Sequence, residues 1–433
     1  MSTSARPPDS TSRAAANRWV LVTLASLPFA VVVLLSALTP ASALFPNQAD
    51  VLLYYQNAQH LVGGQRPYLD FALEYPPLAL VPMVVPYLAW PFGEPSFETY
   101  ARLFALQNGC LAATAGIAIA WLAGRPGSDA TPARALSVWA LLAVVAVPYL
   151  AWRLEASAAA LAVAGVALAV ARRPAAAGAV LAVGTLVKVF PIALVPVLVA
   201  WSLARGARGE AARLVVALVV VGASVMGIVA ALVGIEPALA FVRYQQDRLV
   251  QVESVAASVA LVGHVAWGSP VEIVHGFDSV QVVAPGMDAF LAVQALLAIG
   301  SSALVAILAF VRLRDERRAW GDATVASLCV FLVAAVGVLL ATNKVFSVQY
   351  VAWLLPFAAL LARRPVAVVA AMTALSLVIH PVNYAGLINL DPAMVMVLAA
   401  RNAILVALVI LLLHGRRPMA TAPGSLDAPD AQD

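Results

Sequence analysis

The stretch FPNQADVLLYYQNAQHLVGGQRPYLDFALEYPPL, residues 45 to 78, is the first polar island after a long apolar run. Its first half predicts a short helix, because Val51, Tyr55, Ala58 and Val62 recur at the spacing of one apolar face. Gly63-Gly64 is expected to end that helix. We expect it to lie at the membrane surface with the apolar face toward lipid and Asp50 turned toward the protein.

The composition places the chain among polytopic membrane proteins. Of 433 residues, 63% are hydrophobic and 11% are charged, and mean hydropathy is +0.92. The net charge of +4 does not indicate nucleic-acid binding, because the arginines cluster in short loops between apolar runs, as the positive-inside rule requires. Cys110 and Cys329 both fall in apolar runs, so a disulfide is not expected.

The apolar runs predict an all-α fold with about twelve transmembrane helices, together with juxtamembrane helices in the first outer loop. Residues 1–18 form a cytoplasmic tail, residues 19–414 the membrane domain, and residues 415–433 a disordered cytoplasmic tail. The outer loops span about 45–99 and 234–287. Residues 78–92 are short for a span and carry three prolines, so we expect them not to cross.

Two apolar runs, residues 174–188 and 191–204, are also short for full spans. Arginines flank the pair on both sides, which predicts a shallow hairpin with Lys188 near its tip. Lys188 and Lys344 are the two lysines among 26 basic residues, and both begin a Lys-Val-Phe triplet at an outer helix end. A compact ammonium there suits a phosphate oxygen, and Arg243 and Arg248 can add bidentate contacts.

The sequence resembles the GT-C superfamily of membrane glycosyltransferases, most closely glycosyltransferase family 87, which uses polyprenyl-phosphate mannose. The residues that carry the resemblance are Asp50, the run PYLDFALEYPPL (67–78), KVFP (188–191) and TNKVFSVQYVAWLLP (342–356). It implies a GT-C-type fold, with Asp50 as general base and a donor phosphate held by basic residues. Paired acidic residues that some relatives carry are missing here, so Mg²⁺ is left open as a cofactor.

These observations predict transfer of a sugar, with mannose expected, from a polyprenyl-phosphate donor to a lipid or glycan acceptor at the extracytoplasmic face, with inversion. The donor phosphate is assigned to Lys188, Lys344, Arg243 and Arg248. The acceptor is assigned to Asp70, Glu74, Tyr75 and Tyr54. Structural alternatives stand beside these roles: Asp50 in a capped first turn, Asp70 paired with Arg66, and lysines that reach the interface.

Two other classes of protein remain alternatives. A secondary transporter or lipid flippase would need inverted repeats and ionisable residues at the midplane. Apart from Arg401, which lies inside the last apolar run with no partner evident from the sequence, neither feature is seen. A polysaccharide polymerase or ligase would share the lipid-phosphate donor and the large outer loop.

Overall fold

The computed structural model describes residues 23–24, 26–27, 29–31 and 49–415, and it is predominantly helical. Six of the helical segments are long and apolar enough to cross a membrane. They are α5 (Phe97–Ala123), α11 (Arg208–Val233), α15 (Met287–Trp320), α16 (Val325–Thr342), the segment Arg363–Val382 that begins with α18 (Arg363–Leu377), and α20 (Pro392–His414). The chain is therefore a helical membrane protein, as predicted. The predicted first membrane helix and both predicted tails fall largely or wholly outside the described residues.

Shorter apolar helices lie at other positions where crossings were predicted. They are α6 (Pro132–Val145) with α7 (Val147–Ala151), α8 (Glu155–Val170), α9 (Pro174–Val187), η2 (Phe190–Leu194) with α10 (Val195–Ala204), and η3 (Val348–Trp353) with α17 (Leu355–Ala358). The chain reverses at Lys188 and Val189, between α9 and η2, where a helical hairpin was predicted.

The bundle packs through small residues, as expected where apolar helices meet in a membrane. A Cβ on Gly178 of α9 would stand 2.1 Å from the carbonyl oxygen of Leu214 on α11. The two backbones therefore touch at this point. By contrast, α16 lies almost wholly inside the bundle, whereas α11 and α15 have few buried apolar residues, Ala211 and Leu214 in α11 and Val305, Ala309 and Leu313 in α15.

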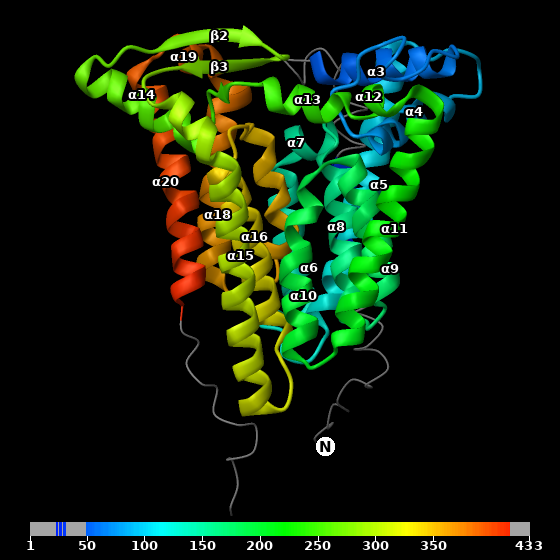
Figure 1. Ribbon diagram of the computed structural model, residues 1–433, viewed down its shortest axis with the longest axis vertical. Helices are drawn as coiled ribbons and strands as arrows, with labels where there is room; N and C mark the ends of the chain where they lie inside the picture. The colour runs from blue at the N-terminus through cyan, green and yellow to red at the C-terminus, as the bar shows by residue number, and fades with distance from the viewer. Residues whose placement is uncertain (1–22, 25, 28, 32–48, 416–433) are drawn as a thin grey trace, which may run out of the picture.

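The turns that carry arginines gather at one end of the bundle. Arg317, in the last turn of α15, donates to the carbonyl of Ala204 at the end of α10. Arg134 at the start of α6 donates to the carbonyl of Leu361, which precedes α18. The tip of α15 lies at the end opposite to the strands (Figure 1).

At the other end, hereafter the loop-rich end, lies a layer of short elements (Figure 1). It contains α3 (Ala49–Val62), α4 (Leu80–Leu88), α12 (Ile235–Ala238), α13 (Ala240–Asp247), α14 (Val255–Trp267) and α19 (Tyr384–Ile388). It also contains an antiparallel sheet of β1 (Val250–Gln251), β2 (Glu272–Gly276) and β3 (Ser279–Val283) in the order β1-β3-β2. The sheet departs from the all-α expectation.

Helix α3 has the predicted bounds and ends at Gly63, but its predicted orientation toward lipid is wrong. Val51 and Ala58 are buried in a protein core that also holds Met83 of α4 and Phe104 of α5. Burial against protein removes the apolar face of α3 from lipid. The helix is therefore fixed on the bundle, and Asp50 in its first turn is fixed with it.

Residues 78–92 follow the expected course. The short 3₁₀ helix η1 (Pro77–Ala79) begins one residue before them and leads into α4. The nine residues of α4 extend about 14 Å at 1.5 Å per residue. This length cannot cross a hydrocarbon core of about 30 Å. Helix α4 lies beside α3 in the layer at the loop-rich end (Figure 1).

Candidate active site

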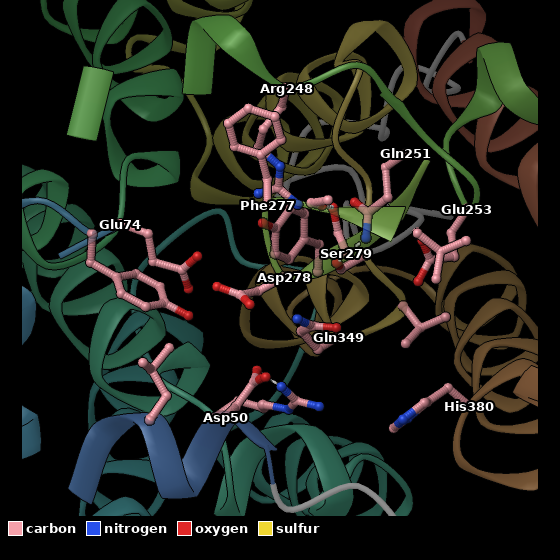
Figure 2. A pocket seen from close by; sticks show the side chains of 18 of the residues that line it. Asp50, Glu74, Arg248, Gln251, Glu253, Phe277, Asp278, Ser279, Gln349 and His380 are labelled. Carbon is pink, nitrogen blue, oxygen red and sulfur yellow. Dashed lines mark hydrogen bonds and ion pairs between the residues drawn. The ribbon is translucent and has the colours of Figure 1, made fainter. Parts of the chain in front are cut away.

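A cavity of about 720 Å³ opens at the loop-rich end. Segments far apart in the sequence form its walls: α3, the residues after β1, the β2–β3 hairpin, η3 and α19 (Figure 2). Its ionisable side chains come from every wall. They are Asp50, Glu74, Arg153, Lys188, Arg248, Glu253, His275, Asp278 and His380, with Tyr75, Tyr350 and Tyr384.

Asp50 lies in this cavity and forms an ion pair with Arg153 (Figure 2). The turn between α7 and α8 positions Arg153, and Asn108 of α5 fixes that turn by donating to the carbonyls of Ala151 and Arg153, both at 3.0 Å. The Arg153 side chain is largely buried, and this burial lowers its pKa. The Asp50 side chain keeps 32% of its surface exposed, so it remains accessible from the cavity.

Lys188 also lines the cavity, and its ammonium already has a partner. The Nζ atom lies 2.5 Å from Oε1 of Glu155, whose side chain is fully buried at the start of α8. The ring centroids of Tyr350 and Trp353 lie 5.0 and 5.8 Å from the same nitrogen. Lys188 is therefore held by a carboxylate and two aromatic rings at the cavity wall.

Arg248 follows α13 and is the other predicted phosphate ligand that the cavity contains. No carboxylate of the described ranges lies within ion-pair distance of it, and its buried Nε has no hydrogen-bond acceptor in the structure. Lys344 does not line the cavity. Its ammonium donates to the carbonyls of Gln246 and Arg248 at 2.8 and 2.5 Å, and burial and the charge of Arg248 lower its pKa. Lys344 therefore fixes the backbone that carries Arg248.

Three further predicted residues lie away from the cavity. Arg243 forms an exposed ion pair with Glu236 at 2.7 Å, and Asp70 forms one with Arg66 at 3.2 Å, the structural alternative weighed above. Tyr54 is buried beneath the cavity wall, with its hydroxyl 3.4 Å from that of Tyr75. Of the predicted acceptor ligands, Glu74 and Tyr75 line the cavity.

The wall opposite Asp50 contains residues outside the predicted set of site residues (Figure 2). Glu253 is buried between β1 and α14, and its burial raises its pKa to about 7, against the charges of Arg401 and Arg248. His380 and Tyr384 lie on the same side of the cavity. Polar residues of this kind are scattered over several loops, and only the fold brings them to one wall.

The structure supplies the missing partner of Arg401. This residue of α20 is fully buried, and its guanidinium donates to the carbonyl of Glu253 at 3.1 Å. Asn402 donates to the carbonyls of Glu253 and Ser254 at 3.2 and 3.0 Å, and the ring of Phe346 lies 3.9 Å from the Arg401 guanidinium. Arg401 therefore holds the segment that carries Glu253 on α20.

The sequence left Mg²⁺ open as a cofactor. Among the described residues, no three His, Cys, Asp or Glu side chains come together in a way that could hold a metal ion. Four carboxylates line the cavity: Asp50, which pairs with Arg153, Glu74 and Asp278 on the same side, and Glu253 on the far wall (Figure 2).

Comparison with models of known protein families gives no match to this chain, and comparison with curated proteins gives none.

Proposed function

We propose that the chain is a GT-C-type membrane glycosyltransferase that transfers a sugar, with mannose expected, from a polyprenyl-phosphate donor to a lipid or glycan acceptor. The observation that carries the proposal is one cavity, at the end of a membrane bundle, that contains an accessible carboxylate and, besides the Arg153 paired with it, two cations. These are Asp50, Lys188 and Arg248. Such a set matches a reaction that removes a hydroxyl proton and releases a phosphate.

In the proposed reaction, Asp50 is the general base. Arg153 contacts Oδ2 of Asp50, so Oδ1 can accept the proton of the acceptor hydroxyl. The hydroxyl oxygen then forms its bond to the anomeric carbon as the bond from that carbon to the phosphate oxygen breaks. The phosphate leaves with the electron pair, and the anomeric configuration is inverted in this single displacement.

The cations are suited to the leaving group. Arg248 offers its buried Nε, which has no acceptor among the described residues, and guanidinium binds phosphate oxygens in a bidentate manner. Lys188 adds a positive charge at the wall, although its pairing with Glu155 reduces the net charge there. Arg248 is therefore the first candidate for the phosphate, with Lys188 in support.

The orientation in the membrane belongs to the same proposal. The arginine-bearing turns favour the cytoplasm under the positive-inside rule, which places the cavity outside and both termini inside. The short apolar helices would then complete about twelve crossings. A polyprenyl tail would lie in the bilayer, with its phosphate and sugar at the loop-rich end.

A transfer assay tests the proposal. Purified protein in liposomes receives radiolabelled polyprenyl-phosphate mannose and membrane acceptors, and Asp50→Asn is compared with wild type. Loss of the base should reduce transfer by about 10² to 10⁴-fold. Asp288→Asn is the matched control, because it removes one carboxylate from an exposed site at the start of α15, outside the cavity.

Full activity of Asp50→Asn would remove this residue from the reaction. If wild type transfers neither mannose nor other sugars from lipid phosphate, the glycosyltransferase proposal fails, and flux assays would then test the transporter alternative. Transfer of an oligosaccharide but no monosaccharide would identify the polymerase or ligase alternative.

A further inference from the structure

The β2–β3 hairpin ends in an unusual turn. Gly276 pairs with Ser279, so Phe277 and Asp278 are the two residues of the turn. Both have positive φ, 54° and 46°. Positive φ at both central residues is typical of a type I′ turn, which strongly favours Asn-Gly. A bulky aromatic residue in such a turn is unfavourable. The sequence therefore keeps these two side chains at a position where the backbone disfavours them.

The tip of this hairpin points into the cavity. Phe277 and Asp278 both line it, and Asp278 lies between Glu74 and Gln349, on the side of Asp50 (Figure 2). The Phe277 ring is 37% exposed, and its centroid is 5.2 Å from that of Tyr244 at an interplanar angle of 80°. The tip thus offers one aromatic ring and one carboxylate to a ligand.

The base of the hairpin is held firmly, so the tip is a positioned element. The Gln281 side chain of β3 donates to the carbonyl of Gly276 at 2.8 Å and accepts from the amide of Leu249 at 3.0 Å. Strand β1, which begins two residues after Arg248, pairs with β3. Backbone strain persists where the surroundings over-determine it, and such sites cluster at ligand-binding positions.

We propose that the Phe277-Asp278 turn is the sugar-binding element of the cavity, with the ring against the C–H face of a hexose and the carboxylate on its hydroxyls. This inference rests on the proposed function. Asp278 would repel a phosphate, which would instead bind Arg248 beside the base of the hairpin. A neutral ligand that has an apolar face and adjacent hydroxyls fits the pair. The hexose can belong to the donor or to the acceptor.

The test replaces the turn with its preferred sequence, Phe277→Asn with Asp278→Gly. Because Asn-Gly relaxes the backbone, the variant should fold, and its Tm should equal or exceed that of wild type. Binding to solubilised protein is measured in two arms, polyprenyl-phosphate mannose against polyprenyl phosphate, and octyl mannoside against octanol. Each arm reports the preference for the mannosylated molecule over its sugar-free partner.

In at least one arm, wild type should prefer the mannosylated molecule by about tenfold, and the variant should lose that preference while it binds the sugar-free molecule as before. The arm affected identifies the sugar as that of donor or acceptor. Equal preferences in wild type and variant in both arms, or no preference in wild type, would overturn the inference.

Two controls separate this inference from the proposed reaction. Arg172→Gly relaxes another positive-φ residue, in an exposed turn after α8 and outside the cavity, and should leave every preference unchanged. Asp50→Asn should retain the preference for sugar while losing transfer. Sugar preference without any transfer by wild type would refute the reaction and uphold the binding element.

Discussion

The buried pair of Lys188 and Glu155 allows a role in folding to be measured separately from a role in binding. Lys188→Met removes the ammonium and leaves the fully buried Glu155 carboxylate without its cation. Removing one partner of a buried ion pair typically costs about 3 to 5 kcal/mol. For a chain of 433 residues each kcal/mol shifts Tm by about 1 °C, so Tm should fall by about 3 to 5 °C.

The double variant Lys188→Met with Glu155→Gln supplies the decisive comparison. The glutamine side chain carries no charge, so the penalty of the unpaired carboxylate disappears, and replacement of a buried pair by neutral residues is often nearly neutral in stability. Most of the lost Tm should therefore return. Thermal unfolding in detergent, followed by intrinsic fluorescence and light scattering, is measured for wild type, Lys188→Met, Glu155→Gln and the double variant.

Transfer activity of the same proteins then isolates the phosphate role. If Lys188 binds the leaving phosphate, the double variant should be stable and still deficient in transfer. If transfer returns together with stability, Lys188 serves the fold alone. The structural reasoning is refuted if the Tm of Lys188→Met lies within about 1 °C of wild type, the shift expected for 1 kcal/mol, or if the second substitution restores nothing.

Three further predictions use other parts of the molecule. Burial raises the pKa of Glu253 from 4.5 to about 7, so the folded state favours the protonated carboxyl. As pH rises from 4.5 to 7, the free energy of unfolding of wild type should therefore fall by on the order of 3 kcal/mol relative to that of Glu253→Gln. A Tm difference between the two proteins that does not grow over this interval would contradict the prediction. Gly178→Ala should abolish folded protein on size-exclusion chromatography because its Cβ meets a backbone carbonyl, whereas Gly222→Ala, with open space around it, should not. Arg248→Ala should raise KM for the lipid-phosphate donor by about 10 to 100-fold, and Arg243→Ala, which breaks an exposed ion pair, should change it much less.

The sequence was sufficient for the elements that repeat a simple pattern. The long apolar runs predicted the spans, and the spacing from Val51 to Val62 predicted α3 to its ends. The break at Lys188 followed from run length and flanking arginines. Such features depend on local hydropathy and on turn residues, which are properties of neighbouring positions.

The remaining features depend on contacts between distant positions. The periodicity of α3 could not tell burial against α4 and α5 from contact with lipid, because both select apolar side chains. Nothing local links Asp50 to Arg153, or Arg401 to the carbonyl of Glu253. The strands are only two to five residues long, too short to stand out among apolar runs.

The hydrogen bond from Arg401 to the segment that carries Glu253 also has a consequence for biosynthesis. A nascent chain that has not yet reached Pro392 already contains Asp50, Lys188 and Arg248, yet the segment that carries Glu253 lacks its contacts with Arg401 and Asn402. Synthesis of α20 supplies Arg401 and Asn402, which complete the contacts of this part of the cavity wall. A chain released before α20 has been made therefore lacks both anchors of the segment that carries Glu253.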